Sequence, residues 1–194
     1  MTKIIIGISG ASGIVYSLKL IEQCELLRSR YEEIYVIYTR SSELIARYEL
    51  GITGLRQYLE NNKCISKVFS EEDIDSFLAS SSNLYDADMV IIPSSMNTVA
   101  KLAHGIQDNL LLRVASSLLR IKRKLIIVFR ETPISRIDLE NLSILAEEGA
   151  IIFPASPAFY IKPKTVDDLV FFIIGKILDL LGIENELYPR WGTS

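Results

Sequence analysis

The chain of 194 residues has little of what metal and redox sites require, because it contains only one histidine and two cysteines. Cys24 and Cys64 stand far apart, in no spacing typical of a metal or redox motif. We therefore expect no metal site. We also expect both thiols to stay reduced, as is usual in the cytoplasm.

The sequence also lacks an excess of positive charge and a long apolar run. Lys and Arg total 21 against 24 Asp and Glu, a net charge of −3, which does not favour a nucleic-acid surface. The most membrane-like segment, residues 169–183, contains Lys176 and Asp179 and is too short for a membrane span. The start of the chain is broken by glycine too early for a signal peptide. These features predict a cytoplasmic protein without a membrane span or a nucleic-acid partner.

Apolar residues, by contrast, are plentiful. They make up 49% of the chain, and the mean hydropathy is +0.26. The length suits one domain, residues 1–194, with a proper core. Because obligate interfaces resemble a core cut in half, the apolar excess predicts a homo-oligomer.

Short apolar runs alternate with helical segments along the whole chain, as in sheets that are buried on both faces. The predicted strands are Lys3–Ile8, Glu33–Tyr38, Met89–Ser95, Lys124–Phe129 and Ala150–Ala155, with a short one near Val68. Predicted helices follow residues 9–13, begin at Ser41 or Ser42 and run toward Glu49, and span Ile74–Leu78, Met96–Ala103, Asn109–Lys122, Ile137–Glu148 and Thr165–Gly182. This order predicts an α/β fold, a single Rossmann-like doubly wound parallel sheet with helices on both faces.

Small polar residues follow the first and fourth predicted strands, at the sheet edge where α/β proteins bind ligands. In GISGASG, residues 7–13, glycines and serines precede a helix, a pattern typical of a tight turn or of an anion site. In PSSMNT, residues 93–98, four small polar side chains crowd a helix start, although one cap needs only one of them. This second group predicts a cradle for a phosphate or the edge of a heteroaromatic ring.

Charged side chains mark three more places. Arg130 and Glu131 directly follow a buried strand, as a surface ion pair or as the end of a site, and burying the carboxylate would be costly unless it is paired or used. Arg113 and Arg120 share one stripe of an amphipathic helix, which by default is a solvated face. Lys176 lies in the apolar final helix, where its stem can reach along apolar surface to solvent.

Five segments in a fixed order carry a family resemblance: GISGASG, PSSMNTVAKLAHGIQDNLLLR, RETPIS, GAIIFPASPAFY and RWG. With them the chain resembles the UbiX-type flavin prenyltransferases over nearly its whole length. The wider family includes flavin-containing cysteine decarboxylases, which share the fold and a related PxSxNT segment.

The resemblance implies transfer of a five-carbon unit from dimethylallyl phosphate to N5 and then C6 of reduced FMN, without a metal. The product, prenylated FMN, would serve a UbiD-type decarboxylase. Members of the family commonly form homo-dodecamers with sites between subunits. Whether the donor is a monophosphate or a diphosphate stays open.

The resemblance also implies roles for particular residues, which fall into three groups. FMN would be bound by Gly10, Ala11, Ser12, Thr39, Ser95, Met96, Asn97, Thr98 and Arg130. Dimethylallyl phosphate would be bound by Tyr160 and Lys176, with positive charge from Arg113 and Arg120. Proton handling would fall to Ser12, Glu49 and Glu131.

Three positions depart from the usual family pattern. Ser94 replaces a cysteine, Arg120 replaces a lysine, and Lys176 stands where many members have arginine. The basic exchanges keep the charge but change its geometry toward a phosphate. Two alternatives are an FMN-dependent decarboxylase of a cysteine-type substrate and a non-catalytic flavin carrier. The decarboxylase alternative lacks the family's histidine before the PxSxNT segment and has RETP in place of PxMN.

Overall fold

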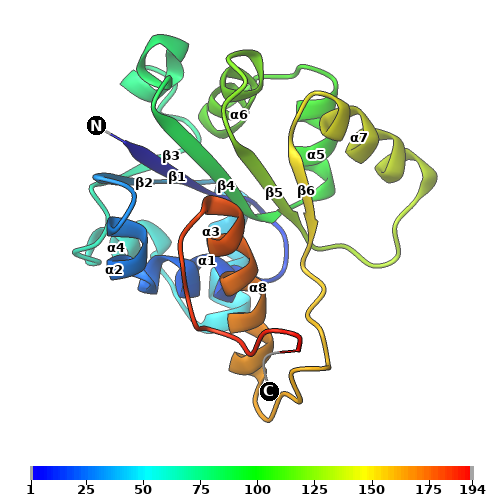
Figure 1. Cartoon of the computed structure of the whole chain (residues 1–194). Helices are drawn as coiled ribbons and strands as arrows, with labels where there is room; N and C mark the ends of the chain where they lie inside the picture. Colours follow the sequence, from blue (N-terminus) through cyan, green and yellow to red (C-terminus); the bar gives the residue numbers. More distant parts are fainter. Residues whose placement is uncertain (1, 193–194) are drawn as a thin grey trace.

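The computed structural model describes residues 2–192 and has a six-stranded parallel sheet at its centre (Figure 1). The strands are β1 (Lys3–Ile8), β2 (Glu33–Tyr38), β3 (Lys67–Ser70), β4 (Ala87–Ser94), β5 (Leu125–Phe129) and β6 (Ile151–Pro154). Their order in the sheet is β3-β2-β1-β4-β5-β6, so β1 and β4 are neighbours at the point where the winding reverses. The predicted doubly wound parallel sheet is confirmed.

Helices cover both faces of this sheet (Figure 1). They are α1 (Ile14–Glu22), α2 (Cys24–Arg28), α3 (Arg40–Leu50), α4 (Leu55–Glu60), α5 (Met96–Ala103), α6 (Leu110–Arg120), α7 (Arg136–Glu147) and α8 (Val166–Leu181). The predicted helix at Ile74–Leu78 is wrong, because only a 3-10 turn, Phe77–Ala79, forms there. Helix α4 was not predicted, since a stretch of six residues is too short for a clear apolar period.

Side chains alternate between the two faces of the strands and so divide the core in two. One half packs α1 and α8 against the sheet, with Ile4 and Ile6 of β1 fully buried beneath them. The other half packs α5, α6 and α7 on the opposite face, around Ile5 and Met89. Helices α6 and α8 therefore lie on opposite sides of the sheet, which matters for the site.

Polar caps fix where several helices begin. Ser95 accepts a hydrogen bond from the backbone N–H of Thr98 at the start of α5, and Thr165 with Asp168 forms the predicted capping box of α8. The cap of α3 is Thr39 rather than the predicted Ser41 or Ser42, so the helix starts directly after β2. Within residues 2–192, no helix has both the length and the apolar character that crossing a membrane requires.

A disulfide joins Cys24 and Cys64, so the expectation of two reduced thiols is wrong for this structure. Cys24 begins α2 and Cys64 lies in the loop before β3, and packing brings their Cα atoms to 5.6 Å. Sequence spacing gave no sign of this contact, because the two residues are 40 positions apart. Cys24 follows the end of α1, and Cys64 precedes the start of β3. The bond therefore lies at the amino ends of the strands.

Candidate functional site

A cavity of about 270 Å³ opens at the carboxyl ends of the first four strands, beside the switch point between β1 and β4. In doubly wound sheets this is where ligands bind. Five of the predicted flavin-binding residues meet here with other polar side chains. The lining is Gly10, Thr39, Ser41, Glu71, Ser95, Asn97, Thr98, Lys101, Asn109 and Leu112.

Close packing holds the loop after β1 against its neighbours. A Cβ atom at Gly10 would overlap the side chain of Ser41, so only glycine fits this approach. The buried hydroxyl of Ser9 donates to the Pro93 carbonyl at 3.0 Å and accepts from the Ser95 N–H at 2.8 Å. These bonds tie the loops after β1 and β4 together and so form one wall of the cavity.

The backbone N–H groups at the start of α1 are already occupied by Glu49 of α3. Its carboxylate accepts from Gly13 N at 2.9 Å and from Ile14 N at 3.0 Å. Gly13 adopts a left-handed conformation at this N-cap, with φ of 110°. Of the two interpretations of this loop, a tight turn or an anion site, the second is met here by a carboxylate of the chain itself, while the neighbouring Ser12 side chain is exposed.

Arg130 directly follows β5 and carries an unsatisfied buried donor. Its Nε atom is buried and has no hydrogen-bond partner among the described residues. The guanidinium lies near Tyr16, whose pKa is raised by burial despite the opposing effect of Arg130. A buried donor left unpaired is costly. An acceptor such as a phosphate or a flavin carbonyl oxygen would satisfy it, so the residues present fit FMN.

Glu131 is exposed, contrary to the cost that the sequence suggested for a carboxylate at the end of a buried strand. Its Oε1 accepts from the backbone N–H of Thr132 at 3.1 Å. The strand ends two residues earlier, at Phe129, and the chain that follows Glu131 through Thr132 and Pro133 is exposed. Within a single chain the Glu131 carboxylate stays in contact with solvent, so a cost of desolvation gives no argument for a catalytic role of this residue.

A second cavity, of about 570 Å³, opens beside Tyr160 and the C-terminal residues Pro189–Gly192. The Tyr160 ring meets Phe172 at 6.0 Å and Trp191 at 5.0 Å between ring centroids. Lys176 Nζ lies 5.8 Å from the Phe172 ring and 5.2 Å from the Tyr188 ring. The structure therefore brings Tyr160 and Lys176 together in an aromatic cluster.

Arg113 and Arg120 do not join that cluster. They project from α6, on the other face of the sheet from α8, and line a separate hollow of about 360 Å³ with residues 74–76 and 79–81. Arg113 Nε donates to the Ala79 carbonyl at 3.0 Å, and Arg120 Nη2 donates to Ser117 Oγ at 3.2 Å. Among the described residues, no group of three or more His, Cys, Asp or Glu could hold a metal.

Comparison with known proteins decides the family. Residues 1–178 match the family model named Flavoprotein. A flavin prenyltransferase UbiX from Saccharolobus solfataricus is 44% identical over 190 residues, covering 97% of this chain and 92% of the relative. The chain belongs to the UbiX family.

Two solved structures of similar proteins extend the comparison. AnUbiX (PadA1), in complex with FMN and dimethylallyl pyrophosphate, superposes with a TM-score of 0.88 at 30% identity and covers 98% of that chain. A dodecameric FMN-dependent UbiX-like decarboxylase from Escherichia coli O157:H7 superposes with a TM-score of 0.87 at 31% identity. These matches cover 100% and 98% of this UbiX-family chain.

The structure shows what surrounds two of the three positions that depart from the UbiX pattern. Ser94 is fully buried, and its hydroxyl has no hydrogen-bond partner among residues 2–192. Cysteine tolerates such a site better, because its thiol behaves as a small hydrophobe. Lys176 gains the two aromatic faces described above, which suit a cation.

Sequence reasoning missed four polar residues of the first cavity, which are Ser41, Glu71, Lys101 and Asn109. Glu71 accepts from Arg40 N and from Asn109 Nδ2, both at 2.7 Å, and so joins the starts of α3 and α6. Lys101 pairs with Asp108 at 2.6 Å. Glu71 does follow a strand, which was a usable signal, but it lies in the least regular part of the sequence.

Proposed function

We propose that this protein is a flavin prenyltransferase that transfers the dimethylallyl group of dimethylallyl phosphate to N5 and C6 of reduced FMN. Membership of the UbiX family supports this assignment, and one feature of the site carries it. Arg130 has a buried, unpaired Nε, and its backbone N–H donates to the carbonyl of Ser94, directly before the loop that lines a cavity of hydroxyl and amide groups. This donor set suits the phosphate and ring edge of a flavin.

We assign FMN to the first cavity, where Gly10, Thr39, Ser95, Asn97 and Thr98 meet. Ala11 and Ser12 follow Gly10 in the loop after β1, and Met96 begins α5 directly after Ser95. Arg130 would supply charge-assisted hydrogen bonds through its planar guanidinium. Because the Ser95 hydroxyl caps α5 and is hydrogen-bonded to the Thr98 hydroxyl, both hydroxyls would be held in place before the ligand arrives.

We assign dimethylallyl phosphate to the aromatic cluster around Tyr160 and Lys176. Breaking the allylic C–O bond places negative charge on the leaving phosphate and positive charge on the five-carbon group. Lys176 would stabilise the phosphate in the transition state. The faces of the surrounding rings would stabilise the developing cation.

Ring closure forms a bond between C6 of the flavin and the double bond of the transferred group, so the double bond takes up one proton and C6 releases another, which must be accepted in the site. We assign this task to Glu131, with Ser12 and Glu49 in supporting positions. Glu49 would act from the start of α1, where two backbone N–H groups hold its carboxylate in place. The released phosphate is a second available proton acceptor.

Assembly would complete the donor site. Arg113 and Arg120 lie across the sheet from Lys176, so one chain does not supply all four predicted donor-binding residues at one place. We propose a homo-oligomer, with a dodecamer as the expected form because the related UbiX-like decarboxylase is dodecameric. Exposed apolar side chains near Glu131 on the α7 side, including Ile134, Ile137 and Leu139, support a covered surface there.

We further propose a UbiD-type decarboxylase as the recipient of prenylated FMN and the cytoplasm as the location. The first assignment rests on the chemistry of the product, which is useful only to an enzyme that takes it as a cofactor. A disulfide is unusual in the cytoplasm, although intracellular proteins of hyperthermophilic archaea and bacteria do contain them.

The decisive experiment is to incubate the purified protein with reduced FMN and dimethylallyl phosphate without oxygen and to weigh the extracted flavin. We expect the flavin mass to rise by one dimethylallyl unit, with no need for added metal. A parallel reaction with dimethylallyl pyrophosphate compares the two donors. Unaltered flavin with both donors would leave a flavin carrier, and activity lost to a chelator but restored by magnesium would contradict the metal-free transfer.

Tyr160→Phe and Lys176→Ala should weaken the use of dimethylallyl phosphate while leaving FMN binding intact. Losing a hydrogen bond to a charged group costs about 1.5–3 kcal/mol, so we expect kcat/KM for the donor to fall roughly 10- to 100-fold for Lys176→Ala. FMN affinity, followed by flavin fluorescence, should stay near the parental value. Equal losses for both ligands would show that the two cavities are wrongly assigned.

Mixed oligomers of Lys176→Ala and a second variant, Arg113→Ala, test whether the donor site is shared between chains. Co-expression of Lys176→Ala with Arg113→Ala chains should restore part of the activity, because mixed oligomers then contain some sites with both parental residues. Light scattering should give a mass well above the 21.9 kDa of one chain. Absence of any recovery in mixed oligomers would argue against a site shared between chains.

A further inference from the structure

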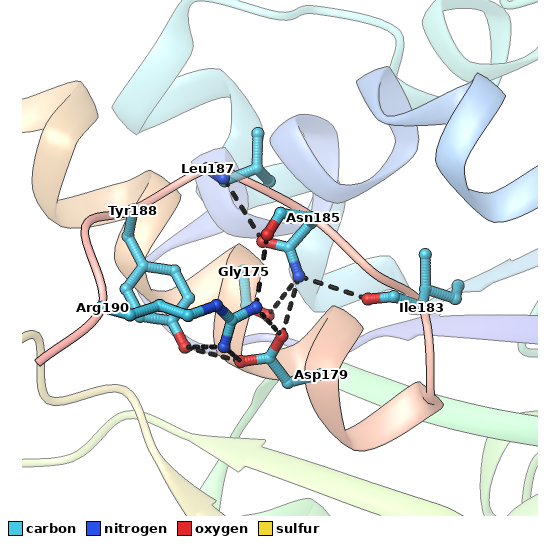
Figure 2. Close-up of polar contacts among 7 residues, drawn as sticks. All are labelled: Gly175, Asp179, Ile183, Asn185, Leu187, Tyr188 and Arg190. Carbon is cyan, nitrogen blue, oxygen red and sulfur yellow. Dashed lines mark hydrogen bonds and ion pairs between the residues drawn. The ribbon is translucent and has the colours of Figure 1, made fainter. Parts of the chain in front are cut away.

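A hydrogen-bonded cluster fastens the C-terminal segment, residues 182–192, onto α8 (Figure 2). Its centre is the carboxylate of Asp179, on the last turn of α8. This carboxylate accepts from Asn185 Nδ2 at 2.9 Å, from the Tyr188 hydroxyl at 2.5 Å, and from Arg190 Nη1 and Nη2 at 3.0 and 2.8 Å. We call the pair of Asp179 and Arg190 the latch.

Two further hydrogen bonds, both involving Asn185, support the latch. Arg190 Nη2 also donates to the Asn185 carbonyl at 3.2 Å, and Asn185 Nδ2 donates to the Gly175 carbonyl at 3.1 Å (Figure 2). A Cβ atom at Gly175 would overlap the Tyr188 ring, so glycine lets the segment lie flat on α8. The bidentate contact between Arg190 and Asp179 fixes the orientation of the guanidinium as well as its distance from the carboxylate.

The electrostatics favour a closed latch at neutral pH. Partial burial alone would raise the pKa of Asp179, but hydrogen bonds from Arg190 and Tyr188 outweigh it and hold the pKa below its ordinary value. Burial and the bond to Asp179 raise the pKa of Tyr188 to about 12. Asp179 is therefore ionised and Tyr188 protonated, which is the combination that the four donated bonds require.

The fastened segment forms one wall of the second cavity. Arg190 is followed directly by Trp191, whose ring lies 5.0 Å from that of Tyr160. The Tyr188 ring lies 5.1 Å from Phe172 and 5.2 Å from Lys176 Nζ. Without the latch, Ile183 and Tyr188 would still be buried in the core, but the exposed Trp191 would lose the bonds that hold the adjacent Arg190.

We propose that Asp179 and Arg190 are positioning residues, which hold Tyr188 and Trp191 against Tyr160 and Lys176 and so preserve the donor-binding cavity. This inference rests on the proposed function of that cavity. Arg190 also lines the second cavity whereas Asp179 does not, so Asp179→Asn separates positioning of the wall from direct contact with the donor. Displacement of the wall by about 1 Å is enough to cost roughly 100-fold in rate in well-oriented sites.

The test compares Arg190→Ala and Asp179→Asn with the conservative variant Arg190→Lys and with Glu186→Ala, which changes an exposed carboxylate on the same segment. We expect kcat/KM for dimethylallyl phosphate to fall about 10- to 100-fold in the first two, chiefly through KM, with FMN affinity unchanged. Arg190→Lys should recover part of the loss, and Glu186→Ala should behave as the parent. The double variant of Asp179→Asn and Arg190→Ala should lose no more than Arg190→Ala alone.

A second readout does not depend on turnover. Trp191 is the only tryptophan of the chain, so its fluorescence anisotropy reports on the segment directly. We expect faster depolarisation in Arg190→Ala than in the parent or in Glu186→Ala. Parental kinetics in Arg190→Ala, or equal losses of donor use and FMN binding, would overturn the inference. If the parent itself forms no prenylated flavin, the proposed function fails, and an unchanged anisotropy in Arg190→Ala would then overturn the latch as well.

Discussion

Replacing Glu131 by glutamine is expected to slow the formation of prenylated FMN roughly 10²- to 10⁴-fold, the range that general acid–base catalysis supplies. The amide keeps the size of the side chain, and its oxygen can still accept from the Thr132 N–H as the carboxylate does. Only the group that takes up a proton is lost. FMN affinity should therefore change far less than the chemical step.

The measurement is a single turnover of reduced FMN with saturating dimethylallyl phosphate, with FMN binding followed separately by fluorescence. Glu140→Gln is the matched control, because it removes an exposed carboxylate from α7, where Glu140 pairs with Arg136 at 2.7 Å. That pair is well exposed and contributes little. Parental rates in Glu131→Gln would remove Glu131 from the mechanism and leave it as a loop residue.

The exposure of Glu131 changes the argument for its role without removing it. In one chain the side chain faces solvent, so the proton acceptor would be in water rather than in a closed site. The apolar side chains that follow it, among them Ile134 and Ile137, are also exposed. A neighbouring subunit that covers them would enclose Glu131 too, which is why the glutamine test belongs on the assembled protein.

The fold was largely predictable because local signals and burial agreed. The continuous apolar runs at β1 and β5 required a sheet covered on both faces, and Gly149 and Gly182 marked helix ends with φ of 102° and 75°. The stretch from Gly51 to Tyr85 was less predictable. Its elements are short and polar, and tertiary packing rather than a repeating apolar pattern fixes them.

The candidate site was predictable as a set of loops but not as a set of contacts. The polar residues at the strand ends predicted where the first cavity lies, and the family resemblance identified Tyr160 and Lys176 as donor-binding residues. Nothing in the sequence pairs Glu49 with the start of α1, 35 and 36 positions away, or Asp179 with Arg190. Such long-range bonds depend on how whole helices pack, so only the structure reveals them.

Removing the disulfide should destabilise the protein strongly while leaving its activity intact at low temperature. The bond closes a loop of 40 residues, and restricting the unfolded chain in this way is worth roughly 2–4 kcal/mol. For a chain of this size, we expect the melting temperature of the double variant Cys24→Ala, Cys64→Ala to fall by about 4–16 °C. Cys64 is buried and Cys24 half-buried, so alanine at both positions introduces no polar group into the core.

The parent treated with reductant is the matched control, since it loses the bond but keeps both side chains. Its melting temperature should fall close to that of the double variant, and reductant should not affect the double variant at all. Because the bond lies at the amino end of the sheet and the first cavity at the carboxyl end, kcat/KM at 25 °C should stay parental in all three samples. A parent that melts at the same temperature with and without reductant, and whose mass without reductant is that of two free thiols, would show that the bond does not form in solution.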